Sequence, residues 1–186
     1  MPEHHFDYII VGNGLAGLQL ALSFKDDYFF QNKKIALIYI SKKLNNDKTW
    51  SFWENKATSL SDLAYKSWDK ASIITSKNYK LINLKPYKYK SIRSIDFYNY
   101  AFNQLKNNTN FQFIIDKVEG VIDNDIVTLN TTKKSYYASH VFDSRSPQVL
   151  NKNIKKNTTL IKHFIGCVIK TEDDSFKEDK VTKMDY

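Results

Sequence analysis

Short apolar runs flank a longer stretch of helical character in the N-terminal part of the chain. Residues 7–11 and 34–40 are continuous apolar runs with the length of buried strands. Residues 15–24 between them have the composition of a buried helix, which we expect to end near residues 25–27. The sequence therefore predicts a strand–helix–strand unit over residues 6–41.

The rest of the chain predicts one more helix and a series of strands. Apolar residues recur at helical spacing over residues 94–106, where we expect Ser94 to be the N-cap and Asp96 to lie in the first turn. Residues 71–75 and 79–84 have the pattern of two strands joined by a polar turn. This mixture of elements is typical of the α/β class. Further strands are expected over residues 111–115, 118–122, 126–130 and 136–142.

Three of the five glycines lie within six residues, between the first expected strand and the first expected helix. In this Gly-x-Gly-x-x-Gly motif, Gly12 permits a tight turn, Gly14 lets the backbone approach a pyrophosphate, and Gly17 lets the helix pack closely on the sheet. The helix N-terminus then faces the phosphates with free N–H groups and a positive dipole end. The alternative interpretation is a tight turn without a ligand. The motif predicts the cofactor-binding set Gly12, Asn13, Gly14, Leu15, Ala16 and Gly17.

The end of the second expected strand lacks the acidic residue that belongs to this motif. A carboxylate there would accept hydrogen bonds from the ribose hydroxyls of a dinucleotide. This chain has Tyr39, Ile40, Ser41 and Lys42 at that place, and Asp47 lies too far into the following loop. Because a hydroxyl is a weaker acceptor than a carboxylate, we expect weakened binding of the ribose.

Residues 49–54 concentrate three large aromatic side chains, those of Trp50, Phe52 and Trp53. One interpretation is a loop that packs its aromatic rings onto the domain. The other is the wall of a substrate pocket for a flat or polyunsaturated ligand. A stacking platform for nucleic acid is disfavoured by the charge composition described below.

Asp143 and Arg145 follow the last apolar strand of the α/β pattern. Ligands of open α/β sheets lie at the carboxyl ends of such strands, so both residues are candidates for cofactor binding. A surface ion pair or a turn cap is the alternative. No Ser/His/Asp order and no metal-ligand spacing emerges from the sequence, so we assign no catalytic and no metal-ligating residue.

Composition and charge narrow the classes of function. The net charge of +8 comes with 28 basic residues, of which only Arg93 and Arg145 are arginines. Because arginine is the preferred residue for bidentate recognition of phosphates and bases, this lysine excess argues against a nucleic-acid partner. Diffuse lysine charge is sufficient for peripheral contact with an anionic surface such as the inner membrane.

Further features indicate a cytoplasmic protein that is not secreted. The single cysteine excludes a disulfide framework within the chain. No apolar run approaches the roughly 20 residues of a membrane-spanning helix. The N-terminus also lacks a basic segment followed by an apolar one, so no secretory signal is expected.

Several stretches of the sequence resemble the N-terminal part of the bacterial lycopene β-cyclases, the flavoprotein family of carotenoid biosynthesis. They occur in the family's order, and the aromatic segment is the most distinctive of them. The matching stretches are residues 7–17, 47–54, 92–98, 141–145, 163–166 and 184–186. The sequence departs from the family at Tyr39, Lys162, Cys167 and Tyr186, where the family has an acidic residue, glutamine, tryptophan and phenylalanine.

The resemblance implies an FAD-binding Rossmann-like βαβ domain with the beginning of a β-rich substrate domain. Residues 71–90 and 160–186 would then be incomplete segments of the substrate domain. The family's reaction is redox-neutral: a carboxylic acid protonates the terminal double bond of lycopene, a neighbouring double bond captures the carbocation, and loss of a proton leaves a β-ring. The implied cofactor is reduced FAD, with NAD(P)H as its reductant, and the implied substrate is lycopene.

The acidic motif that resembles a general acid in this family lies after the element matching residues 184–186. The resemblance therefore implies that residues 1–186 are a truncated FAD/NAD(P)-binding region, belonging to an incomplete, inactive or split cyclase. A missing C-terminal chain would be its partner. Two alternatives stay open, namely another FAD-dependent oxidoreductase and a non-catalytic nucleotide-binding remnant.

Overall fold

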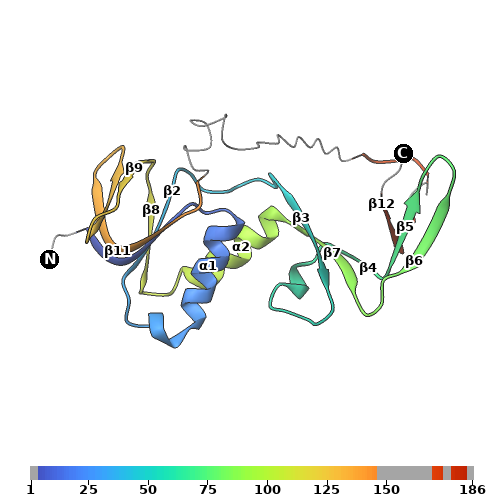
Figure 1. Ribbon diagram of the computed structural model, residues 1–186, viewed down its shortest axis with the longest axis horizontal. Coiled ribbons are helices and arrows are strands. Elements are labelled where there is room, and N and C mark those ends of the chain that lie inside the picture. The colour runs from blue at the N-terminus through green and yellow to red at the C-terminus, as the bar shows by residue number, and fades with distance from the viewer. Residues whose placement is uncertain (1–3, 146–168, 174–176, 184–186) are drawn as a thin grey trace, which may run out of the picture. The chain divides into compact units, whose positions relative to one another are not determined.

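The computed structural model describes residues 4–145, 169–173 and 177–183. This part of the chain contains two α-helices, α1 (Leu15–Asp26) and α2 (Ser94–Leu105), and two single-turn 3-10 helices, Tyr28–Phe30 and Ser61–Leu63. Its strands, labelled in Figure 1, are β1 (His5–Val11), β2 (Ile35–Tyr39), β3 (Thr49–Glu54), β4 (Lys66–Trp68), β5 (Lys70–Ile74), β6 (Tyr79–Asn83), β7 (Lys88–Arg93), β8 (Phe111–Ile115), β9 (Val118–Ile122), β10 (Val127–Thr131), β11 (Ser135–Asp143) and β12 (Lys180–Lys183).

The chain divides into two compact units. The first comprises Met1–Trp50, Asp62–Tyr65 and Ser91–Arg145, and the second comprises the remaining segments. Both helices and the largest sheet belong to the first unit. Two of the boundaries fall inside β3 and β7, so each of these strands runs from one unit into the other.

A six-stranded sheet in the order β8-β2-β1-β11-β10-β9 organises the first unit (Figure 1). Strands β8, β2, β1 and β11 are parallel, whereas β10 and β9 extend the sheet as antiparallel strands. The expected strand–helix–strand unit is present as β1, α1 and β2, with β1 and β2 as neighbours. Strand β11, distant in sequence, pairs with the other side of β1. The four parallel strands therefore end at one edge of the sheet.

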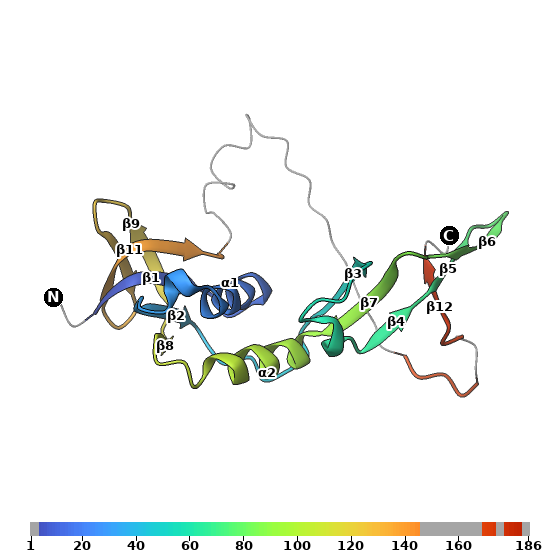
Figure 2. The same cartoon turned by 90° about the horizontal axis from the view of Figure 1, so that it is seen from below.

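The central strands and the two helices form the core of the first unit. All five residues of β2 are buried, as expected for a parallel strand that is covered on both faces. Helices α1 and α2 lie side by side (Figures 1 and 2). Phe97, Ala101 and Leu105 of α2 are fully buried, which confirms the helical spacing of apolar residues in this segment.

The second unit contains a three-stranded sheet in the order β12-β5-β6. Strands β5 and β6 are antiparallel, which confirms the two-stranded unit expected there, and β12 pairs with β5 in parallel. Strand β12 comes from the range 160–186. Within that range residues 160–168, 174–176 and 184–186 lie outside the described residues, and so do the matched stretches 163–166 and 184–186. A further three-stranded sheet has the order β3-β7-β4.

The aromatic segment is a strand, and the interpretation as a loop was wrong. Exposure alternates along β3: Thr49, Ser51 and Trp53 are exposed, whereas Trp50 and Phe52 are half-buried. This alternation has the period of two that a β-strand imposes on its side chains. Bulky side chains on both faces of the segment hid this period in the sequence.

Candidate functional site

Three loops meet at the carboxyl edge of the parallel strands. Val11 is opposite Ile38 of β2 and Asp143 of β11, so β1, β2 and β11 end at the same level. The glycine loop follows β1, Ser41 lies just after β2, and Ser144 follows β11. In open α/β sheets this edge is the place where ligands bind.

The three glycines of the loop have different surroundings. Gly12 has a φ of +102°, and a Cβ there would collide with the Ser144 hydroxyl. A Cβ at Gly17 would collide with the carbonyl oxygen of Gly12, so α1 packs directly against the turn. A Cβ at Gly14 would meet nothing within 4 Å. The motif is therefore crowded at its first and third glycines, Gly12 in the loop and Gly17 in α1, and open at the middle one.

The open position coincides with the N-terminus of α1. Gly14 is the N-cap residue, no side chain caps the helix, and its first turn contains no acidic residue. The first N–H groups of a helix have no partner within the helix, and the dipole end is positive. Leu15 is half-buried and Ala16 is exposed at this end. These groups form a cradle of the kind that binds a phosphate or pyrophosphate.

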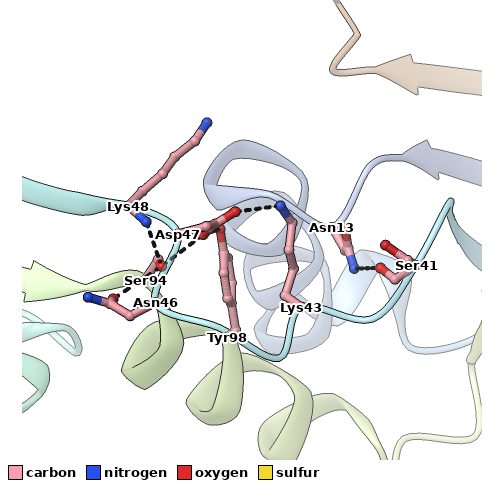
Figure 3. Close-up of polar contacts among 8 residues, drawn as sticks. All are labelled: Asn13, Ser41, Lys43, Asn46, Asp47, Lys48, Ser94 and Tyr98. Atoms are coloured by element: carbon pink, nitrogen blue, oxygen red, sulfur yellow. Dashed lines mark hydrogen bonds and ion pairs between the residues drawn. The ribbon is translucent and has the colours of Figure 1, made fainter. Parts of the chain in front are cut away.

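Asn13 joins the glycine loop to the end of β2. Its side chain is buried, and Nδ2 donates a hydrogen bond to the Ser41 carbonyl oxygen at 2.8 Å (Figure 3). The Gly12 N–H group donates to the Ile38 carbonyl oxygen, also at 2.8 Å. The Asn13 side chain therefore holds the cradle in position and leaves the peptide backbone to face a ligand.

Ser144 is a residue of this edge that sequence reasoning missed. Its hydroxyl donates to the Val11 carbonyl oxygen at 2.7 Å, and its N–H group donates to the same oxygen at 3.2 Å. The signal in the sequence was a small hydroxyl residue between the two candidates Asp143 and Arg145. A cavity of about 220 Å³ lies beside α1 and the end of β11. It is lined by Ile10, Ala16, Gly17, Leu20, Phe142, Asp143 and Ser144.

Asp143 and Arg145 form an ion pair with each other at the end of β11. The Arg145 guanidinium donates to both carboxylate oxygens of Asp143, at 2.7 Å between Nη2 and Oδ2. Nη1 also donates to the Val118 carbonyl oxygen at 2.7 Å, which ties the end of β11 to β9. Burial acts to raise the pKa of Asp143, but the hydrogen bonds and charge of Arg145 outweigh it and lower that pKa. Although this strand is apolar in sequence, its carboxyl end is exposed, since Phe142 is 41% exposed.

The residues after β2 do not offer a ribose-binding carboxylate. Tyr39 is buried, and its ring packs edge-on against Phe102 at a centroid distance of 5.9 Å. Burial raises the pKa of the Tyr39 hydroxyl. Ser41 and Lys42 are exposed. Of the two hydroxyl groups considered from the sequence, that of Ser41 is the accessible one.

Asp47 fastens the loop after β2 to helix α2 (Figure 3). Its Oδ1 accepts hydrogen bonds from the Ser94 hydroxyl at 2.9 Å and the Tyr98 hydroxyl at 3.0 Å, and its Oδ2 pairs with Lys43 at 2.7 Å. The hydrogen bond from Lys43, with those from Ser94 and Tyr98, lowers the pKa of Asp47 to about 2. Burial and the bond to Asp47 raise the pKa of Tyr98 to about 12. Asp47 is therefore a fully engaged structural carboxylate.

The sequence predicted Ser94 as the N-cap of α2, and this prediction was wrong. Arg93 is the N-cap residue, and no side chain bonds to the free N–H groups. The buried Ser94 hydroxyl instead accepts a hydrogen bond from the Lys48 N–H group at 3.0 Å. The contact with the loop after β2 therefore competes successfully with capping, because it satisfies a hydroxyl that is removed from water.

The aromatic candidates do not share one face of β3. Trp50 packs edge-on against Phe97 and Tyr98 of α2, with a centroid distance of 5.8 Å to each ring. Trp53 is 55% exposed and contacts Tyr89 at 4.7 Å between ring centroids. Because successive side chains of a strand point to opposite faces, Trp50 and Phe52 lie on one face and Trp53 on the other. The three rings do not form a single continuous wall.

Two kinds of feature do not occur within the described ranges. No group of three or more His, Cys, Asp or Glu side chains that could hold a metal ion is found there. Neither of the two α-helices described is long and apolar enough to span a lipid bilayer.

A model of the family described as "Lycopene cyclase protein" matches residues 7–186. No curated relative matches the sequence. The fold is similar to that of p-nitrophenol 4-monooxygenase PnpA from Pseudomonas putida, with a TM-score of 0.62 and 16% identity over 80% of this chain and 44% of that one. A variant of PqsL from Pseudomonas aeruginosa gives a TM-score of 0.66 and 9% identity over 86% of this chain and 48% of that one.

A third solved structure, that of CtdE in complex with FAD, gives a TM-score of 0.56 and 16% identity, over 80% of this chain and 40% of that one. The chain thus spans less than half the length of these three proteins. Together with the parallel sheet and the βαβ unit, the likeness shows a mixed α/β fold of the Rossmann-like type.

Proposed function

The chain belongs to the lycopene cyclase family, and on this premise we propose that it binds FAD through the cradle between β1 and α1. The observation that carries the proposal is the contrast among the three glycines. Cβ atoms at Gly12 and Gly17 would meet protein atoms, whereas a Cβ at Gly14 would enter open space in front of the N-terminus of α1. A glycine is needed at such a position when a ligand approaches the backbone closely.

The residues present fit the pyrophosphate of FAD better than its ribose. The backbone around Gly14 and the dipole of α1 would hold the phosphates, and Asn13 and Ser144 would keep the cradle in shape through their bonds to Ser41 and Val11. The end of β2 offers the Ser41 hydroxyl where a carboxylate belongs. We therefore expect FAD to bind more weakly than it would with an acidic residue at that place.

The family reaction that this cofactor would serve is the redox-neutral cyclisation of lycopene. Protonation of the terminal double bond creates a carbocation, the neighbouring double bond closes the ring, and loss of a proton restores neutrality without net oxidation. When bound, reduced FAD would supply an electron-rich ring that can stabilise positive charge. The proton donor must be an uncharged acid near neutral pH, which requires a raised pKa.

The described carboxyl groups with a displaced pKa lack this property. Each described carboxyl group whose pKa departs from its ordinary value is shifted downward, because it accepts hydrogen bonds or faces a cation. These groups are Asp47, Glu54, Asp116 and Asp143. We propose that the described part of the chain supplies cofactor binding and that the protonating acid is provided by residues outside it.

Titration with FAD, followed by quenching of flavin fluorescence, tests the binding proposal. Gly14→Val should abolish binding and leave the far-UV circular dichroism unchanged, because a Cβ at this position meets no protein atom within 4 Å and the branched side chain would occupy the phosphate position. Gly120→Val is the matched control, since a Cβ at Gly120 of β9 also meets nothing within 4 Å. Unchanged FAD affinity of the Gly14→Val protein would contradict the proposal.

Expression of the chain in a lycopene-accumulating bacterium, with chromatography of the pigments, tests the proposal that the described part of the chain does not supply the protonating acid. We expect no β-carotene and no γ-carotene, because each described carboxyl group with a displaced pKa is shifted downward and the acidic motif of the family follows the element that matches residues 184–186. Formation of either pigment would show that a residue of this chain acts as the acid.

A further inference from the structure

The net positive charge of the chain is concentrated in one segment. Residues 70–90, which run from the start of β5 into β7, contain six lysines and neither Asp nor Glu, so they carry +6 of the net charge of +8. The segment also contains no arginine, the residue that best recognises the phosphates of nucleic acids. A lysine cluster without arginine is suited to an anionic lipid surface, which needs charge but no bidentate geometry.

Protein carboxylates neutralise only half of this charge. Among the described residues, Lys77, Lys80 and Lys85 are exposed and have no ion-pair partner. Lys77 lies in the turn between β5 and β6, Lys80 lies in β6, and Lys85 lies in the turn after β6. The other three lysines of the segment form ion pairs, namely Lys70 with Asp179, Lys88 with Asp69 and Lys90 with Glu54. The charge that is free to meet a partner therefore lies on the β5–β6 hairpin and the turn after it.

Exposed apolar side chains lie on the same hairpin, which Figures 1 and 2 show with β12 beside β5. Tyr79 is 57% exposed and Leu81 is 51% exposed, and both lie on one face of β6 because alternate residues of a strand share a face. Lys180 of β12 lies on this face too, since its Nζ donates to the Tyr79 hydroxyl at 2.9 Å and is 5.1 Å from the centre of that ring. Apolar side chains, a phenol and ammonium groups together are typical of a protein surface at a membrane–water interface.

The tip of the hairpin extends past the neighbouring strand. The described residues of β12 pair with Lys70–Ile73 of β5, whereas Tyr79 is opposite Ile74, beyond that pairing. Lys77 and Tyr79 therefore lie where β12 does not flank the hairpin.

We propose that the β5–β6 hairpin docks on an anionic lipid bilayer. Tyr79 and Leu81 enter the headgroup region, and Lys77 and Lys80 pair with the lipid phosphates. Charge complementarity selects this occupant, because each lysine near such a surface strengthens binding about fivefold. A second copy of the chain on the same hairpin would bring these lysines against one another, and like charges repel. The hairpin belongs to the second unit, so the proposal is independent of the cradle between β1 and α1 in the first unit.

Co-sedimentation of the full chain with phospholipid vesicles tests the proposal. One set of vesicles consists of phosphatidylcholine alone, and the other is an equal mixture of phosphatidylcholine and phosphatidylglycerol. We expect the chain to bind the anionic vesicles at least about tenfold more tightly, because several unpaired lysines act together. The difference should shrink as the salt concentration rises, since ions screen exposed charges.

Two double variants that remove the same charge locate the electrostatic contact. Lys77→Gln/Lys80→Gln should weaken binding to the anionic vesicles about 25-fold, as expected for the loss of two lysines at the surface. Lys106→Gln/Lys117→Gln, which removes two exposed lysines of the first unit, should weaken it less than about twofold. Circular dichroism establishes that each variant is folded.

Two further variants test the entry of apolar side chains without changing the charge. Leu81→Gln should weaken binding to the anionic vesicles about fivefold, because the half-exposed leucine loses its burial in the headgroup region. Ile122→Gln is the matched control, since Ile122 of β9 is 49% exposed but lies in the first unit, and its binding should equal that of wild type.

Several results would overturn the proposal. Equal binding to the two kinds of vesicle would do so, and so would undiminished binding of the Lys77→Gln/Lys80→Gln protein. Binding to soluble polyglutamate through the same lysines, without binding to vesicles, would assign the hairpin to an acidic polypeptide instead. A dimer in size-exclusion chromatography that Leu81→Gln dissociates would assign it to a second copy of the chain. Vesicle binding is measured without FAD, so failure of the proposed FAD binding would leave this result unaffected.

Discussion

At the scale of single residues, the cradle is made by backbone atoms in close contact. Gly12, Gly17 and Ser144 come from the turn after β1, from α1 and from the end of β11, and each limits the space available to another. Gly14 alone among the motif's glycines is open. Substitutions at Gly12 and Gly17 should therefore affect folding, whereas a substitution at Gly14 should affect ligand binding alone.

Gly17→Ala should destabilise the protein, although alanine is the better helix former. Alanine gains about 1 kcal/mol of helix propensity over glycine. A Cβ at Gly17 collides with the carbonyl oxygen of Gly12, which belongs to the backbone and cannot rotate away. Overpacking costs about 1–3 kcal/mol, and we expect the upper part of this range here. Urea unfolding should show a net loss, and Gly14→Ala should stay close to wild type. A Gly17→Ala protein as stable as wild type would contradict the close packing of α1 against the turn.

Asp47 should give the stability a distinct dependence on acidic pH. Its folded pKa of about 2 lies below the ordinary value of 3.8, so the unfolded chain takes up the proton first as the pH falls. The contribution of Asp47 to the stability of the folded state is therefore present above about pH 4 and is lost between about pH 4 and 2. Asp47→Asn should lower the free energy of unfolding by about 1 kcal/mol at neutral pH. The loss is small because the Asp47 side chain is 34% exposed. The difference between the two proteins should vanish near pH 2, and a constant difference from pH 7 to 2 would contradict this role.

At the scale of elements, the loop after β2 and strand β3 are anchored on helix α2. Asp47 bonds to two hydroxyl groups of α2, and Trp50 packs on two of its rings. Helix α2 in turn lies beside α1, whose N-terminus is the proposed phosphate site. The geometry of the loop next to the cradle therefore depends on contacts that are made on α2.

Trp50→Ala should weaken the protein more than Trp53→Ala does. The half-buried Trp50 ring contacts Phe97 and Tyr98, and its removal leaves a gap beside α2. Truncation of a fully buried aromatic residue costs about 3–5 kcal/mol, so we expect about 2 kcal/mol for this half-buried one. Trp53 is more than half exposed, so Trp53→Ala should lower the free energy of unfolding by less than about 1 kcal/mol. Urea unfolding followed by circular dichroism compares the two variants, and equal losses would contradict the difference in packing.

At the scale of the whole molecule, the proposed nucleotide site belongs to the first unit alone. Residues of the cradle, the end of β2 and the end of β11 all lie within Met1–Trp50 and Ser91–Arg145. A ligand that binds only the folded state stabilises it by about 2.7 kcal/mol at 100 times its Kd. The stabilisation should be localised if the two units open independently.

Hydrogen exchange measured by mass spectrometry with and without FAD tests this expectation. We expect slower exchange in β1, α1, β2 and β11 of the first unit, and unchanged exchange in β5 and β6 of the second. The Gly14→Val protein, which should not bind FAD, is the control. Equal protection of both units would show that they unfold as one cooperative body.

Local patterns in the sequence determined the elements whose signals are short in range. The apolar runs around residues 12–17 predicted β1, α1 and β2, because strand, glycine turn and helix are adjacent in the chain. Helical spacing predicted the buried face of α2, and a polar turn between apolar runs predicted the β5–β6 pair. The glycine motif likewise located the cradle, since a tight turn demands residues without side chains at that place.

Contacts between distant segments were decided only by the tertiary structure. Ser144 meets the glycine turn because β11 pairs with β1, and Asp47 is engaged because α2 lies against the loop after β2. The capping role expected for Ser94 failed for the same reason, since its hydroxyl bonds to the loop that carries Asp47. A residue's type shows which bonds it can form, but its partner is set by which distant segment the fold brings within reach. Pairings of this kind have no periodic signal in the chain, and so the structure alone assigns them.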